Sequence, residues 1–212
     1  MTIKYESEDK RIRVEEKNGQ KALFVDNVIQ GVCDMEGNPL SPYMVFVKEF
    51  GKTLPKDSHC LFLGGGAYIL PEYFQKTLKL ESWSVEKDDD VALVAHSHFG
   101  PITHTELTHH SAEDFDNGDE SCLGATKGTF NFIFLDCYDK GFPEKLYCPE
   151  FITRCKTALT PKGVFAVNYG GTAVEIEAFG KMFATVFANV KVNLIAMDPD
   201  FKGQVQGVFF CS

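Results

Sequence analysis

The stretch Cys60–Gly66, which reads CLFLGGG, decides the fold, because a short apolar run ends directly in three glycines. Residues 67–78 follow with the spacing of a helix. In an open α/β sheet a ligand lies beyond the carboxyl ends of the strands, and glycines after the first strand let the backbone approach that ligand closely. The sequence therefore predicts a ligand-binding turn between a strand and a helix, at Gly64, Gly65 and Gly66.

Beyond this turn, apolar runs alternate with amphipathic segments to the end of the chain. We expect strands over 82–88, 129–139 and 164–170, helices over 90–99, 149–163 and 173–188, and a closing antiparallel strand pair over 191–199 and 203–212. Continuous apolar strands that alternate with helices indicate a parallel sheet covered on both faces. The predicted fold is α/β, with a doubly wound, mostly parallel, Rossmann-like sheet.

The residues before the glycine turn have a different pattern. Two short β-branched and aromatic runs flank Asp26-Asn27, which is typical of a tight hairpin turn, so we expect a small β-hairpin over 21–34. The charged residues 1–19 predict either an exposed first strand or a frayed tail, and 43–54 have helical spacing. We therefore expect residues 1–50 to form a hairpin with a connecting helix, and residues 51–212 to form a nucleoside-binding catalytic domain.

The next predicted strand ends in a carboxylate, about 20 residues after the glycines. At this position Glu86, beside Lys87, can accept hydrogen bonds from both hydroxyls of a ribose. The sequence has neither the later glycine of a pyrophosphate-binding turn nor the Lys-Ser/Thr of a P-loop, which favours a nucleoside without phosphates. In the simpler interpretation the glycines form only a tight turn and Glu86 is a solvated charge.

Five segments together resemble the spermidine synthase family and the spermidine-synthase-like class I methyltransferases: ALFVDNVIQ, CLFLGGG, SVEKDDDV, FIFLDCYDKGFP and GQVQGVFFCS. The resemblance covers roughly residues 21–212 and implies that the cofactor is S-adenosylmethionine or decarboxylated S-adenosylmethionine. It implies that Gln30 contacts this cofactor, and that Tyr43, Asp136 and Asp139 orient the attacking amine and remove its proton. An ammonium group is no nucleophile until it is deprotonated, so a nearby carboxylate is what such a reaction requires.

The implied cofactor site continues through Ala67, Lys87, Ser111 and Ala112 and contains two departures from the family pattern. Ala67 stands where an acidic residue holds the amine of an aminopropyl donor, and Ser111 stands where an acidic residue binds the adenine amine. These departures favour a methyltransferase that acts on an amine in a small molecule or a protein. One alternative is an aminopropyltransferase whose amine-binding acids come from elsewhere, such as Asp139, Glu113 or Asp200. Another is a catalytically inactive nucleoside-binding or scaffolding protein.

Composition narrows the class of partner. A net charge of −9 and a pI near 5.1 argue against nucleic acid, whose binding requires clustered Lys and Arg. No stretch approaches the roughly 18 apolar residues of a membrane span, and the seven cysteines without a C-x-x-C pair indicate reduced thiols, so we expect a cytoplasmic protein. His96 and His98 are two residues apart on a predicted helix, which argues against a metal site. The nineteen phenylalanines allow a homodimer interface.

Overall fold

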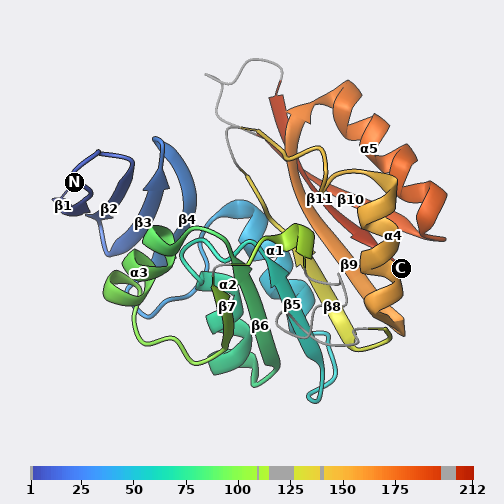
Figure 1. Cartoon of the computed structure of the whole chain (residues 1–212), viewed down its shortest axis with the longest axis horizontal. Helices are drawn as coiled ribbons and strands as arrows, with labels where there is room; N and C mark the ends of the chain where they lie inside the picture. Colours follow the sequence, from blue (N-terminus) through green and yellow to red (C-terminus); the bar gives the residue numbers. More distant parts are fainter. Residues whose placement is uncertain (1, 109, 115–126, 139–140, 197–203) are drawn as a thin grey trace.

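The computed structural model describes residues 2–108, 110–114, 127–138, 141–196 and 204–212, which form two β-sheets with flanking helices (Figure 1). Within these residues, no helix is long and apolar enough to cross a membrane. The larger sheet has seven strands in the order β10-β11-β9-β8-β5-β6-β7, and the smaller one has four in the order β1-β2-β3-β4.

The smaller sheet is antiparallel and is built from the first 34 residues: β1 Thr2–Glu6, β2 Ile12–Lys17, β3 Gln20–Val25 and β4 Val28–Asp34. The predicted hairpin is confirmed as β3 and β4, with Asp26 and Asn27 at φ 48° and 63° in its turn. The prediction of one strand or a tail for residues 1–19 was wrong, because they form two strands. Ile12 and Val14 alternate with charged residues and are buried, which is the pattern of a strand with one face on the core.

The larger sheet consists of β5 His59–Leu63, β6 Glu81–Glu86, β7 Thr105–Thr108, β8 Phe130–Leu135, β9 Leu159–Thr172, β10 Val190–Ala196 and β11 Gln204–Cys211. Strands β5, β6, β7, β8 and β9 pair with one another in parallel. Strand β11 pairs antiparallel with β9 and with β10. The chain extends from β5 to β6 and β7 on one side, and then continues with β8 and β9 on the other. The strand order therefore reverses between β5 and β8, and such a switch point is where open α/β sheets bind their ligands.

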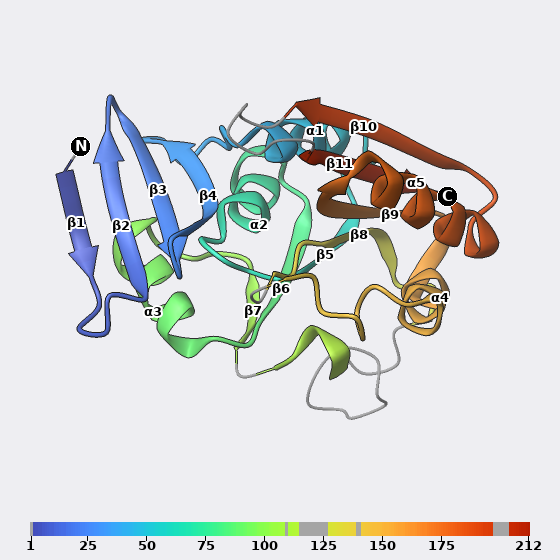
Figure 2. The ribbon, with the colours of Figure 1, turned by 90° about the horizontal axis from the view of Figure 1, so that it is seen from above.

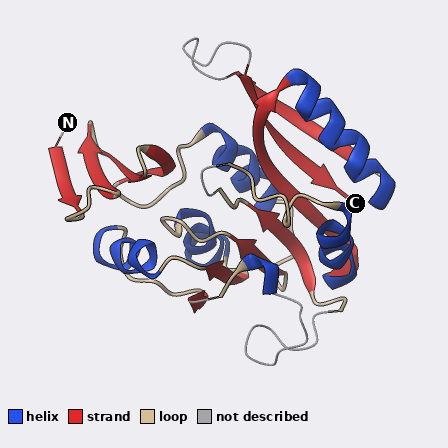
Figure 3. Ribbon diagram, turned by 45° about the horizontal axis from the view of Figure 1, so that its top comes forward, coloured by secondary structure: helices blue, strands red, loops and turns tan. Residues whose placement is uncertain are grey.

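Helices cover both faces of this sheet, as Figures 2 and 3 show for α1 Pro42–Gly51, α2 Ile69–Tyr73, α3 Asp89–His98, α4 Pro149–Ala158 and α5 Ala173–Val186. Residues of α1, α2 and α3 belong to one buried apolar cluster, and residues of α4 and α5 belong to a second one. The predicted helix over 149–163 ends early, at Ala158, because Leu159 already pairs with Phe130 of β8. A short π-helical turn, η1 Phe74–Leu78, extends α2.

Ion pairs join the smaller sheet to α3, beside the strand that carries Glu86. Arg11 of β2's leading turn places Nη1 2.5 Å from the Asp88 carboxylate and Nη2 3.2 Å from that of Asp90. Asp88 also caps α3, since its Oδ1 accepts hydrogen bonds from the N–H groups of Asp90 and Val91. Asp88 is therefore the N-cap of α3, a position at which aspartate is strongly preferred.

Candidate active site

The glycine turn brings the carboxyl ends of β5 and β8 into direct contact. Gly64 has φ +99°, and a Cβ atom there would lie 2.4 Å from the carbonyl oxygen of Asp136. A Cβ atom at Gly65 would lie 2.3 Å from the ring of Tyr68. No other residue fits at Gly64 without separating the strands, so this glycine allows the two ends to approach one another.

Glu86, at the end of β6, faces the turn. Its Oε2 accepts hydrogen bonds from the N–H groups of Gly65 at 3.1 Å and Gly66 at 2.8 Å, and its Oε1 accepts one from Asp88 N–H at 3.0 Å. Burial raises the pKa of Glu86 above its ordinary value, against the opposing effect of these donors. A carboxylate has about four lone-pair positions, so one remains for a ligand hydroxyl while Glu86 stays on the turn.

The side-chain position of Gly66 has almost no neighbours. This residue has φ +52°, and a Cβ atom placed on it would meet only the Cβ of Gln30, at 3.9 Å. The Gly66 N–H donates to Glu86, so the carboxylate lies beside this position. Hydroxyl groups of a nucleoside would find an acceptor here, and the small glycine surface would admit a flat or curved ligand, so these residues fit the predicted cofactor.

Asp136 lies at the end of β8, on the other side of the turn. Its N–H donates to Leu63 O at 2.9 Å and its Oδ1 accepts a hydrogen bond from Asn168 Nδ2 at 2.8 Å, and the Tyr43 hydroxyl is near enough to its carboxylate to act on its pKa. Burial raises the pKa of Asp136 to about 6, although Asn168 and Tyr43 both act to lower it. A carboxyl with this pKa can take up a proton near neutral pH, which is what a general base does.

Tyr43 connects Asp136 to the smaller sheet. It is 9% exposed on α1, and its hydroxyl also lies 3.1 Å from the backbone oxygen of Gln30. Burial, followed by the charge of Asp136, raises the pKa of Tyr43 well above 10, so the hydroxyl stays protonated. The structure thus brings together two predicted catalytic residues and a predicted cofactor residue from three separate elements.

Sequence reasoning missed two members of this site. Asn168 of β9 is 7% exposed and donates to Asp136, and Gln206 of β11 donates from Nε2 to Asn168 Oδ1 at 2.9 Å. The signal for Asn168 was an amide within the apolar strand VFAVNYG, because a buried amide requires hydrogen-bond partners. Gln206 had no comparable signal, because it occurs in a mixed polar and apolar segment.

The structure also describes the remaining predicted cofactor residues. Ala67 is 3% exposed, and Ala112 is buried in the same apolar cluster as Val85. Ser111 Oγ accepts a hydrogen bond from Glu113 N–H at 3.3 Å, and Lys87 is exposed beside Glu86. Asp139 and Asp200 lie outside the described residues.

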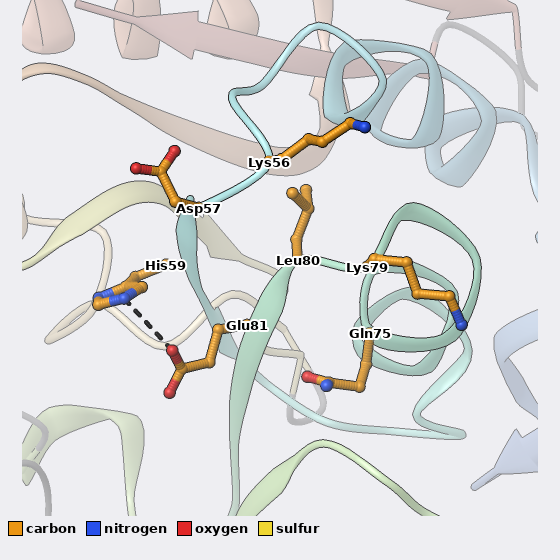
Figure 4. Close-up of a pocket in the computed structure, with 7 residues that line it drawn as sticks. All are labelled: Lys56, Asp57, His59, Gln75, Lys79, Leu80 and Glu81. Atoms are coloured by element: carbon orange, nitrogen blue, oxygen red, sulfur yellow. Dashed lines mark ion pairs between the residues drawn. The ribbon is translucent and has the colours of Figure 1, made fainter.

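A pocket lies at the opposite end of the sheet from the glycine turn (Figure 4). It has a volume of about 360 Å³ and is lined by Lys56, Asp57, His59, Gln75, Lys79, Leu80 and Glu81. His59 Nε2 lies 3.3 Å from Glu81 Oε2 across it. His59 and Glu81 are the first residues of β5 and β6, so this pocket is at the amino ends of the strands, away from the end where this fold class binds ligands.

Comparison with known proteins establishes the fold. No family model and no curated protein sequence matches the chain. A probable spermidine synthase from Corynebacterium glutamicum has a TM-score of 0.76 at 17% identity, over 100% of this chain and 78% of that one. The spermidine synthase from Thermotoga maritima has a TM-score of 0.69 at 18% identity, over 99% and 72%. Human methyltransferase-like protein 13 in complex with SAH has a TM-score of 0.63 at 19% identity, over 80% and 81%. The chain therefore has the spermidine-synthase-like fold of the class I S-adenosylmethionine-dependent enzymes.

Proposed function

We propose that this protein transfers an alkyl group from a sulfonium nucleoside to an amine, and that its reaction is methyl transfer from S-adenosylmethionine. The observation that carries the proposal is the Asp136 carboxyl, which is hydrogen-bonded to Asn168, has Tyr43 beside it and belongs to the strand end that contacts Gly64. A proton acceptor thus lies beside the turn at which this fold class binds its ligand. The structural neighbours described as spermidine synthases and as a methyltransferase support the same group of enzymes.

The residues of the chain supply binding and proton transfer. When bound, the nucleoside supplies a carbon attached to a positively charged sulfur, which leaves with the electrons of the broken C–S bond. Glu86, held on the turn by the N–H groups of Gly65 and Gly66, offers its remaining acceptor position to the nucleoside. The Asp136 carboxylate accepts a proton from the acceptor ammonium, which frees the nitrogen lone pair to form the new N–C bond. Tyr43 orients the nitrogen, and Asp136 then releases the proton to solvent.

Two observations bear on which group is transferred. Ala67 offers no charge to the amine of an aminopropyl donor, which supports S-adenosylmethionine as the donor. The likeness to the spermidine synthases, however, extends over 99–100% of the chain and so includes the smaller sheet, whereas the likeness to the human methyltransferase covers 80%. Aminopropyl transfer from decarboxylated S-adenosylmethionine is therefore the second candidate.

Calorimetry with both nucleosides, followed by product analysis with a panel of amines, separates the candidates. Methyl transfer predicts tighter binding of S-adenosylmethionine and release of S-adenosylhomocysteine. Preference for the decarboxylated form, with release of 5'-methylthioadenosine, would overturn it in favour of aminopropyl transfer. If neither nucleoside at millimolar concentration raises the melting temperature, an inactive scaffolding protein is favoured, because a ligand selective for the native state must stabilise it.

The variant Asp136→Asn tests the base. It keeps the shape of the side chain but cannot take up a proton, so we expect turnover to fall by about 10² to 10⁴ with nucleoside affinity unchanged. Because the Asp136 carboxylate is the reactive form, activity of the wild type should rise as the pH increases through about 6. Wild-type turnover in the variant would remove Asp136 from this role.

A further inference from the structure

A chain of side-chain hydrogen bonds leads from β11, across β9, to the proposed base at the end of β8. Gln206 Nε2 donates to Asn168 Oδ1 at 2.9 Å, and Asn168 Nδ2 donates to Asp136 Oδ1 at 2.8 Å. The three residues come from β11, β9 and the end of β8, which are adjacent strands. In the antiparallel register of β9 and β11, Asn168 lies opposite Val208, so Gln206, two residues along β11, is on the same face.

The orientation of the Asn168 amide decides whether an N–H donor or an oxygen faces the Asp136 carboxylate. One end of an amide accepts hydrogen bonds and the other donates them, and a reversed Asn168 would place its oxygen against the carboxylate. The N–H donor of Gln206 requires the Asn168 oxygen to face β11, which leaves the NH₂ group facing Asp136. Asn168 is 7% exposed, so there is little solvent to replace either contact.

We propose that Gln206 is a positioning residue: by orienting the amide of Asn168, it keeps an N–H donor on Asp136 Oδ1 and holds the carboxylate ready to accept a proton. The catalytic consequence rests on the proposed function. The effect on the carboxyl group itself does not, since the protonation of Asp136 can be measured without turnover.

Among the described residues, three neutral groups and several charged ones surround the end of β8. Burial raises the pKa values of Tyr43, Cys137 and Tyr147 well above their ordinary values, so these three groups stay neutral. The charges of Glu86, Asp136, Lys87 and Glu113 all act on the Cys137 thiol. The pKa of Asp136 itself is set by its burial, which raises it, and by Asn168 and Tyr43, which lower it.

The test measures the pKa of Asp136 by carbon NMR of protein labelled at aspartate carboxyls, with Asp136→Asn to assign the signal. Gln206→Met removes the donor at similar volume, so Asn168 is no longer held and the pKa of Asp136 should rise by about one unit. The matched control is Gln204→Met, an exposed glutamine on the same strand, which should leave the pKa unchanged. Gln206→Glu is a second variant that lacks the donor, and it should also raise the pKa.

A double-mutant comparison identifies the route. If Gln206 acts through Asn168, adding Gln206→Met to Asn168→Leu should produce no further shift in the pKa of Asp136. The proposal would be overturned if Gln206→Met left the pKa of Asp136 unchanged. It would also be overturned if Gln206→Met shifted this pKa by the same amount in the Asn168→Leu background as in the wild type. In an active enzyme the acidic limb of the pH–rate profile should move upward with the pKa. Absence of any transferase activity would refute the proposed function and leave the NMR result intact.

Discussion

Replacing Gly66 by alanine separates the ligand-binding role of the glycine turn from its role in folding. Gly66 has φ +52°, and its Cβ would clash with nothing, because the Cβ of Gln30 is 3.9 Å away. The cost to stability is therefore that of a left-handed backbone alone, roughly 1–2 kcal/mol. In a chain of this size this corresponds to a fall of about 2–8 °C in melting temperature.

The new methyl group would enter the space in which we place the nucleoside. We expect S-adenosylmethionine to bind at least about tenfold more weakly, which corresponds to roughly 1.4 kcal/mol. Gly19→Ala is the matched control, because Gly19 has φ +74° in a turn of the smaller sheet with nothing within 4 Å. It should lose similar stability and keep full affinity.

Gly64→Ala provides the opposite case. Its Cβ would lie 2.4 Å from a backbone oxygen, and this overlap adds roughly 1–3 kcal/mol to the cost of the left-handed backbone. Urea denaturation and calorimetry measure both quantities for all three variants. Wild-type affinity in Gly66→Ala, together with the expected loss of stability, would show that the nucleoside does not lie over Gly66.

Two further predictions concern buried carboxylates. Glu86→Gln replaces an acceptor that faces Asp88 N–H with a donor, so it should cost about 1–3 kcal/mol in urea denaturation. Glu86→Gln should also weaken nucleoside binding. The control Glu81→Gln, at the exposed start of the same strand, should change neither stability nor binding. Equal behaviour of the two variants would contradict the role of Glu86 in holding the turn and the nucleoside. Burial acts to raise the pKa of Glu72, but hydrogen bonds from His104 and Lys76 hold this pKa well below its ordinary value of 4.5. The Glu72 carboxylate therefore contributes to stability above pH 4.5, and this contribution is lost as the pH falls below 4.5. Denaturation from pH 7 to pH 3 should show a steeper loss for the wild type than for Glu72→Gln, and parallel curves would refute this.

The local pattern of the chain was sufficient for the architecture and for part of the site. Apolar runs that alternate with helical segments predicted the doubly wound sheet. The glycines together with Glu86 predicted that the candidate site lies at the carboxyl ends of the strands. The weakly patterned residues 1–19 were misjudged, because charged strands become recognisable only when the face that they bury is known. The early end of α4 at Ala158 was missed for a related reason, since pairing of β9 with β8 competes with helix formation there.

By itself, the sequence determined most of the secondary structure, the position of the turn and the types of side chain beside it, because these depend mainly on contacts between near neighbours along the chain. Tertiary structure alone decided that Asn168 holds Asp136 and that Gln206 orients Asn168, since these bonds join residues 32 and 38 positions apart. It also decided that Glu86 lies on the glycine turn with one acceptor position left. Such contacts depend on strand order and register, and a hydrogen bond forms only when those place donor and acceptor within about 3 Å.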